Sequence, residues 1–276
     1  MSYNKILTIQ DISCVGQCSL TVALPILSAC GQETVILPSA VLSSHTGGFK
    51  GFTFRDLTDD IPNIQKHWQS EGIKFDAIYT GYLGSLKQIN YVADIFDTMG
   101  NDACIKICDP AMADNGKLYS IFDMEYAKEM AKLCAKADII IPNITEVCLM
   151  TGVEYKERYD EAYINNALKA LSNIGIKTVV LTGVSYDDNT TGVVVYENGL
   201  YQYYTHKKLP KGSHGTGDIF ASAFTGALMS GKDTFKAAEI AADFVLKCML
   251  NTVDDDAHWY GVKFEPVLGE LIKSLI

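Results

Sequence analysis

The chain has 276 residues, 48% of them hydrophobic and 20% charged, which is the composition of a globular protein with a large buried core. Its formal net charge of −10 argues against nucleic acid and anionic membrane surfaces as partners, because both would repel it. No apolar run approaches the roughly 20 residues that span a bilayer, and Met1–Asp11 has no signal-peptide core. We therefore expect a cytoplasmic protein with no membrane and no nucleic-acid partner.

The 8 cysteines are scattered along the chain, and no two form a CxxC pair. Zinc sites and small disulfide frameworks both depend on closely spaced cysteines. We therefore expect reduced thiols, as is usual in the cytosol.

Short β-rich runs alternate with helix-like stretches over the first two thirds of the chain. The runs are apolar almost throughout, which is typical of strands covered on both faces of a parallel sheet. This alternation predicts a three-layer α/β/α fold with a mostly parallel central sheet. The expected strands are Lys5–Gln10, Glu33–Leu37, Asp76–Thr80, Ile105–Cys108, Asp138–Ile141 and Thr178–Leu181, and the expected helices include Asp59–Glu71, Leu86–Met99, Met124–Lys136 and Glu161–Ile174.

The pattern changes after Leu181. The β runs Gly192–Tyr196 and Leu200–Thr205 flank Asn198–Gly199, and an Asn–Gly pair between two β runs is a strong hairpin signal. We therefore expect an antiparallel hairpin at one edge of the sheet. No linker or repeat interrupts the chain, so a single domain over residues 1–276 is the prediction. Further helices are expected over Gly217–Met229, over Thr234–Asn251 and near Pro266–Leu275.

The segment Lys211–Phe220 carries the clearest chemistry. Gly215, Thr216 and Gly217 directly precede or open a predicted helix, so their amides can converge on one anion at the positive helix end. Asp218 would lie in the first helical turn beside that anion, where a carboxylate can accept a proton from an attacking hydroxyl. The same four residues could also form an ordinary loop with an acidic first turn, because Asp is favoured there.

Two common nucleotide-binding patterns are absent. No G-x-x-x-x-G-K-[ST] sequence occurs, which excludes a P-loop enzyme. The first strand is followed by Asp11–Gly16 in place of a G-x-G-x-x-G turn, which weakens a dehydrogenase reading.

Four segments in order resemble pyridoxal kinases of the ribokinase-like superfamily. They are Gly81–Ser85, Cys108–Gly116, Pro142–Glu146 and Gly215–Asp218, supported by Ile9–Gln10 and Ser44–Gly47. The likeness covers nearly the whole chain, and its specificity comes from the ordered combination, since no single motif is decisive. It implies a ribokinase-like fold, ATP and Mg²⁺ as cosubstrate and cofactor, a B6 vitamer as substrate and a homodimer; it leaves a monovalent cation open.

The resemblance also implies a role for individual residues. Asp218 matches the base that activates the 5′-hydroxymethyl group, and the Gly215–Gly217 amides match the anion hole for the transferred phosphoryl group. Thr46 and Tyr82 match positions that line the vitamer pocket. The family positions that contact the nucleotide are matched by Asp109, Asn143, Thr182 and Thr216. The positions that hold the metal ion, partly through water, are matched by Asp114 and Glu146.

The residues themselves support this arrangement while leaving simpler roles open. Asp109, Asn143 and Thr182 each follow a predicted strand, and ligands bind at that edge of a parallel sheet. Asn143 and Glu146 could instead be only the capping box of a helix starting near Ile144. Asp109 and Asp114 could lie in plain turns, Thr182 in an ordinary loop, and Tyr82 in the core.

Asp11 departs from the pattern, since many pyridoxal kinases carry Ser at this position. Its carboxylate could pair with a protonated ring nitrogen or the 3-hydroxyl of a vitamer. It could equally accept from the amine of an aminopyrimidine, or it could cap its own turn. Asp11 therefore leaves hydroxymethylpyrimidine as an alternative substrate.

The loop Pro38–Phe54 is rich in Gly and Ser, and we expect a flexible flap over the substrate. A sugar kinase is a weaker alternative, because little chain is available between Glu33–Leu37 and Asp76–Thr80 for a β-rich lid. A catalytically silent binder on the same fold is a further alternative, against which the retained Asp218 argues.

Overall fold

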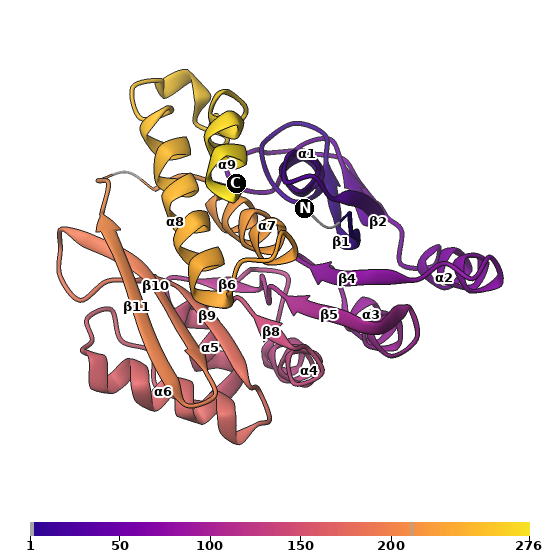
Figure 1. The fold of residues 1–276 in the computed structure, drawn as a ribbon, viewed down its shortest axis with the longest axis horizontal. Coiled ribbons are helices and arrows are strands. Elements are labelled where there is room, and N and C mark those ends of the chain that lie inside the picture. The colour runs from indigo at the N-terminus through magenta and orange to yellow at the C-terminus, as the bar shows by residue number, and fades with distance from the viewer. Residues whose placement is uncertain (1–2, 211) are drawn as a thin grey trace.

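In the computed structural model, which describes residues 3–210 and 212–276, one large sheet forms the centre of the molecule (Figure 1). Its strand order is β11-β10-β9-β8-β5-β4-β1-β2-β3, and a separate two-stranded sheet pairs β6 with β7. The strands are β1 (Lys5–Ser13), β2 (Glu33–Leu42), β3 (Phe54–Asp56), β4 (Phe75–Thr80), β5 (Gly100–Cys108), β6 (Ala113–Asp114), β7 (Lys117–Leu118), β8 (Ile139–Ile140), β9 (Thr178–Val184), β10 (Thr190–Glu197) and β11 (Leu200–Lys207).

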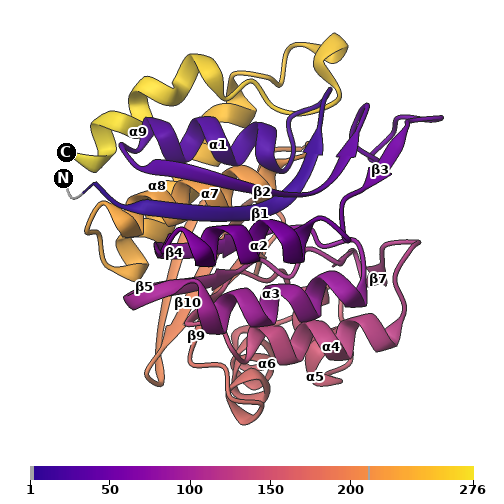
Figure 2. The ribbon, with the colours of Figure 1, turned by 90° about the vertical axis from the view of Figure 1, so that its right-hand side faces the viewer.

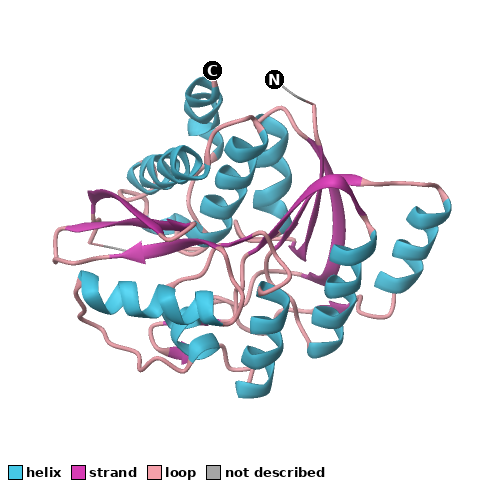
Figure 3. Ribbon diagram, turned by 60° about the horizontal axis from the view of Figure 1, so that its bottom comes forward, coloured by secondary structure: helices cyan, strands magenta, loops and turns pink. Residues whose placement is uncertain are grey.

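Helices cover both faces of the sheet, as Figure 3 shows. Adjacent strand residues such as Ile139 and Ile140 enter opposite hydrophobic clusters, because side chains alternate across a pleated strand. One cluster packs against α2 to α6, and the other packs against α1, α7, α8 and α9. The helices are α1 (Leu20–Ala29), α2 (Ile61–Ser70), α3 (Leu86–Thr98), α4 (Met124–Cys134), α5 (Ile144–Thr151), α6 (Glu161–Asn173), α7 (Thr216–Met229), α8 (Thr234–Leu250) and α9 (Leu268–Leu275).

The predicted three-layer fold with a mostly parallel sheet is confirmed. Strands β9, β8, β5, β4, β1 and β2 pair in parallel, and β10 and β11 form the expected antiparallel hairpin. Asn198 and Gly199 both have positive φ, as the type I′ turn requires. No segment among the described residues is a helix long and apolar enough to cross a membrane.

The opposite edge of the sheet differs from the prediction. β3 pairs antiparallel with the end of β2, so that both edges carry an antiparallel strand. This arm projects from the side of the molecule toward which β1 and β2 run (Figure 2). The expected flap Pro38–Phe54 is therefore shorter, because β2 continues to Leu42 and β3 starts at Phe54. We call residues 43–53 the flap loop.

The carboxyl ends of the parallel strands meet at one edge of the sheet. β5 ends directly before Asp109, and β8 ends shortly before Asn143. Thr182 lies inside β9, which runs to Val184 and is longer than expected. Its amide donates to the carbonyl of Pro142 (2.9 Å), so that Thr182 lies beside Asn143, another predicted site residue.

Candidate active site

A cavity of about 830 Å³ opens at this edge of the sheet. That volume is in the range of small-molecule sites and can hold a nucleotide together with a small ring compound. Every residue that the sequence analysis assigned to the site lines this one cavity: Asp11, Thr46, Tyr82, Asp109, Asp114, Asn143, Glu146, Thr182, Gly215, Thr216, Gly217 and Asp218. Lys211, at the start of the glycine-rich segment, lies outside the described residues.

Gly215 sets the geometry at the start of α7. It has φ of +76° as the residue before the helix, and a Cβ there would lie 1.8 Å from the carbonyl oxygen of Gln17. Only glycine combines this backbone angle with so close a neighbour. The first amides of α7 therefore open toward the cavity without helical partners, at the positive end of the helix.

Asp218 lies in the first turn of α7, half-buried in the cavity wall. Protein atoms surround its carboxylate and reduce its hydration, which raises its pKa to about 7. The negative charge of Asp11 adds to this rise, and the nearby Ser19 backbone opposes it. A carboxylate with a pKa near neutrality is well matched to accepting a proton from an alcohol during group transfer.

Asp109 and Glu146 form a second acidic group deeper in the cavity, and both are buried. Burial raises the pKa of Asp109 well above its usual range, and the charges of Glu146 and Asp218 raise it further. Burial also raises the pKa of Glu146 to about 8. Two buried carboxyl groups without a cation beside them favour the protonated form, so this part of the cavity is prepared for positive charge.

The predicted capping box is present at α5. Asn143 Oδ1 accepts from the Glu146 amide (3.0 Å), and Glu146 Oε2 accepts from the Asn143 amide (2.8 Å). Glu146 Oε1 also accepts from the amide of Met112 (3.1 Å), and Asn143 Nδ2 donates to the carbonyl of Ala113 (2.8 Å). The pair thus fixes the 109–114 loop as well as the helix start.

Asp114 lies on the exposed side of this loop. It ends β6, and the following Asn115 and Gly116 both have positive φ, which makes a tight turn into β7. The Asp114 carboxylate accepts from the amide and side chain of Asn115 (2.8 and 2.9 Å). It therefore remains open to solvent at the cavity mouth.

Asp11, Tyr82 and Thr46 lie on the other side of the cavity. The Asp11 carboxylate is buried and accepts from Ser13 Oγ (2.8 Å) and Ser19 Oγ (2.6 Å). Two side-chain hydroxyls of this chain therefore hold the Asp11 carboxylate. Tyr82 is half-buried, and burial raises its pKa to about 12, so the phenol stays neutral. Thr46 is exposed on the flap loop.

The flap loop is held against the last loop of the chain. His45 Nε2 lies 2.7 Å from the carbonyl oxygen of Tyr260, and His45 Nδ1 accepts from the Gly47 amide (3.0 Å). The rings of Phe49 and Trp259 are 4.7 Å apart. The contacts of His45 with Tyr260 and of Phe49 with Trp259 join residues more than two hundred positions apart, so sequence patterns gave no signal for them.

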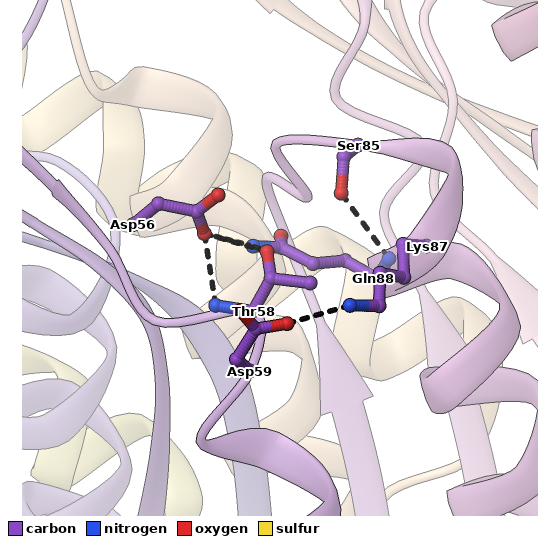
Figure 4. Close-up of polar contacts among 6 residues, drawn as sticks. All are labelled: Asp56, Thr58, Asp59, Ser85, Lys87 and Gln88. Atoms are coloured by element: carbon purple, nitrogen blue, oxygen red, sulfur yellow. Dashed lines mark hydrogen bonds and ion pairs between the residues drawn. The ribbon is translucent and has the colours of Figure 1, made fainter.

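A buried glutamine, Gln88, supports the loop that carries Tyr82, and Figure 4 shows this side chain beside Asp56 and Thr58. Gln88 Oε1 accepts from the Gly84 amide (2.7 Å), and Gln88 Nε2 donates to Thr58 Oγ1 (2.8 Å) and to the carbonyl of Ser39 (3.1 Å). Asp56 on β3 in turn accepts from Thr58 (2.5 Å). Gln88 therefore connects the loop that carries Tyr82 with β2 directly and with β3 through Thr58.

The cavity also has an apolar recess that the sequence analysis missed. It lies between the start of α7, the C-terminal half of α8 and strand β10. Its residues repeat at helical spacing and read as core positions from the sequence alone. They include Val193, Phe220, Ala242, Val245 and Met249.

Comparison with known proteins decides the family. The profile of the family described as phosphomethylpyrimidine kinase matches residues 27–261. The chain belongs to this kinase family. It is 30% identical to the pyridoxal kinase of Dictyostelium discoideum over 243 residues, covering 80% of this chain and 77% of that one. It is 28% identical to the hydroxymethylpyrimidine/phosphomethylpyrimidine kinase of Bacillus subtilis over 217 residues, covering 78% of each.

A solved structure of the same family agrees over almost the entire chain. A Bacteroides thetaiotaomicron protein, crystallised with pyridoxal, has a TM-score of 0.91 at 38% identity and covers 98% of this chain and 96% of its own. The resemblance to pyridoxal kinases drawn from the ordered motifs is confirmed, and the chain is an enzyme. The roles of the individual site residues remain predictions.

Proposed function

We propose that this kinase transfers the γ-phosphoryl group of ATP to the 5′-hydroxymethyl group of pyridoxal, pyridoxine or pyridoxamine. The observation that carries the proposal is the cavity itself. It brings together the half-buried carboxylate of Asp218, the amides at the start of α7 and two buried acids in one cavity. The pyridoxal kinases among its relatives, and the pyridoxal present in a structure 38% identical to this chain, support the choice of substrate.

Asp218 is the proposed general base. In the ionised form its carboxylate takes the proton of the attacking hydroxyl as the oxygen–phosphorus bond forms and the bond to the ADP oxygen breaks. The amides of Gly215, Thr216 and Gly217 donate to the equatorial oxygens of the transferred group, whose charge is spread over them. Gly215 lies directly against the carbonyl oxygen of Gln17, so we expect these three amides, the anion cradle, to be in place before the substrates bind.

The residues on the acidic side fit a magnesium ion that keeps part of its water. No group of three or more His, Cys, Asp or Glu side chains in the described ranges 3–210 and 212–276 could hold a metal alone. Mg²⁺ is commonly bound through one or two carboxylates and substrate phosphates. Asp114 and Glu146 would hold it here, Glu146 through water, since both Glu146 oxygens already accept backbone hydrogen bonds. When bound, the ion would neutralise charge on the phosphates.

The nucleotide would occupy the half of the cavity between β9 and α7. Asp109, Asn143, Thr182 and Thr216 face the proposed phosphate positions there. The apolar recess beside them matches the flat, apolar faces of a purine. The vitamer would occupy the half bounded by Asp11, Thr46 and Tyr82.

Hydroxymethylpyrimidine is the second candidate substrate. It is also a flat nitrogen heterocycle with a CH₂OH arm, and the Bacillus subtilis relative and the matching family profile support it. The same base and anion cradle would serve it, so the two candidates differ only at the ring. A homodimer and a single domain over residues 1–276 stay predictions.

A substrate panel tests the proposal. Purified enzyme with Mg-ATP is offered pyridoxal, pyridoxine, pyridoxamine, hydroxymethylpyrimidine and ribose, and ADP release is coupled to a spectroscopic readout. We expect turnover with at least one B6 vitamer and a product heavier by one phosphoryl group in the mass spectrum. Turnover with hydroxymethylpyrimidine alone would assign the second candidate, and turnover with ribose alone or with no compound would contradict both.

A further inference from the structure

Ser19 has a backbone conformation that L-residues rarely adopt. Its φ is 55° and its ψ is −132°, and it immediately precedes α1. The side chain does not cap the helix: among the described residues no side-chain hydrogen bond from Ser19 to the α1 amides occurs. Such strain costs about 1–3 kcal/mol and persists only where the surroundings impose it, often at functional sites. The helix start alone therefore does not explain this geometry.

Asp11 is the group that holds Ser19 in place. Both residues are 5% exposed, and Ser19 Oγ donates to Asp11 Oδ1 over 2.6 Å. Asp11 Oδ2 accepts from Ser13 Oγ over 2.8 Å. Hydrogen bonds to a carboxylate are stronger than those between neutral groups, so the link can balance the strain at residue 19. Both Asp11 oxygens are thereby directed at serines of this chain.

Ser19 in turn contacts the start of α7. Its backbone lies close enough to the Asp218 carboxylate to lower the pKa of that group. The preceding Gln17 lies against Gly215, and the sulfur of Cys18 lies 3.4 Å from the position of a Gly215 Cβ. The segment 17–19 thus fills the space between the end of β1 and the proposed base.

We propose that Asp11 is a positioning residue that acts through Ser19: it holds the strained segment 17–19 against the start of α7, and this packing fixes the position of the Asp218 carboxylate. The proposal rests on the proposed function, in which Asp218 is the base. In this role Asp11 positions the enzyme's own catalytic carboxylate and does not recognise the substrate ring.

Several titratable groups surround Asp218 from the elements packed around it. Asp11 comes from β1, Cys18 from the loop before α1, Tyr79 from β4 and Asp109 from the end of β5; Tyr119 approaches from the loop after β7. Burial raises the pKa of Cys18, Tyr79 and Tyr119, so these three stay neutral. Asp11 differs from Asp109 because Asp11 also bonds Ser19, in the segment that packs against the start of α7.

A set of single variants separates positioning from ring recognition. For Asp11→Ala and Ser19→Gly we expect kcat for the best vitamer to fall about tenfold while the dissociation constant of that vitamer stays within about twofold. Ser19→Gly is the sharper variant, because it removes the hydroxyl that bonds Asp11 while glycine tolerates the φ of 55° without strain, so that a fall in kcat would not come from misfolding. Asp11→Asn retains one acceptor for Ser19 Oγ and should recover part of the loss. Ser13→Ala removes the other Asp11 hydrogen bond and should lower kcat less than Ser19→Gly.

A double-mutant cycle with Asp218→Ala gives the decisive result. If Asp11 acts through Asp218, Asp11→Ala lowers kcat in the wild-type background and has no further effect when residue 218 is Ala. Equal losses in both backgrounds, or a raised dissociation constant with unchanged kcat, would overturn the proposal while leaving the base in place. No loss for Asp218→Ala itself would instead overturn the proposed function.

Discussion

The two sides of the cavity are built on different principles. The side that faces the proposed phosphates consists of strand ends and helix starts: Asp109, Asn143 and Asp218 each lie within a few residues of a buried element. The opposite side includes the flap loop, where Thr46 is exposed and the loop is fixed by aromatic contacts such as Phe49 with Trp259. The chemistry therefore depends on strand ends and helix starts, and the enclosure of the substrate depends on a loop held by side-chain contacts.

This difference predicts how variants on the two sides behave. Changes on the phosphate side remove interactions formed in the transition state and should lower kcat. Changes on the flap side alter the capture of the substrate and should act mainly on KM. Variants on each side of the cavity test this contrast.

The largest effect is expected for Asp218→Asn. Loss of the proton acceptor should lower kcat by about 10²–10⁴-fold, the usual contribution of general-base help. Vitamer binding should be kept, because the amide has almost the same shape. Steady-state kinetics and calorimetric binding measure the two quantities in one preparation. Asp254→Asn, an exposed carboxylate outside the cavity, is the matched control, and a comparable loss there would argue against a special role for residue 218.

Gly215→Ala should have the next largest effect. A Cβ at 1.8 Å from the Gln17 oxygen, on a backbone with positive φ, forces the segment to shift and costs about 1–3 kcal/mol of unfolding free energy. The displaced amides should also lower kcat. Urea unfolding and initial rates check both parts.

Gly212→Ala serves as the control for this variant, since among the described residues beyond its chain neighbours no atom lies within 4 Å of its Cβ position. Equal behaviour of the two alanine variants would show that the cradle geometry is not needed.

Gln88→Met should lower stability by about 1–3 kcal/mol, because it leaves the Gly84 amide without its partner and removes one of the two hydrogen bonds to the Ser39 carbonyl. It should also raise KM for the vitamer, since Gly84 belongs to the Tyr82 loop. Gln65→Met is matched to it: Gln65 is equally buried, and its side chain bonds Thr98 (3.0 Å). A similar rise in KM for Gln65→Met would assign the change to lost stability alone.

Trp259→Ala should have the smallest effect. Removal of its contact with Phe49 should raise KM for the vitamer roughly two- to tenfold with kcat little changed, as expected for one aromatic pair. Hydrogen exchange of the flap loop should be faster in the variant and should slow in wild type when nucleotide and vitamer bind. Ile272→Ala on α9 is the control. A fall in kcat without a change in KM would contradict a covering role for the loop.

Much of the fold could be predicted because its signals are local. Buried parallel strands read as apolar runs, the Asn198–Gly199 pair has one favourable turn, and residues that follow parallel strands meet at one edge. Those rules also placed Asp109 and Asn143 together. The capping box at Asn143 and Glu146 was predicted from spacing alone.

Other features depend on contacts between distant segments and gave no sequence signal. β3 has only three residues, all exposed, and forms because β2 offers an edge. The positive φ of Ser19 and its hydrogen bond to Asp11 depend on the folded chain, and no pattern in the sequence indicates them. The raised pKa of Asp218 likewise depends on burial within the folded cavity.

The pH dependence of kcat/KM for the preferred vitamer, measured at saturating Mg-ATP in wild type and in Asp218→Asn, tests the central claim most directly. The base must be ionised to act, so activity should be low below the pKa of Asp218 and rise with pH through about 7. This acidic limb should vanish in Asp218→Asn, leaving a low and flat profile. An acidic limb that persists unchanged in the variant would show that another group accepts the proton.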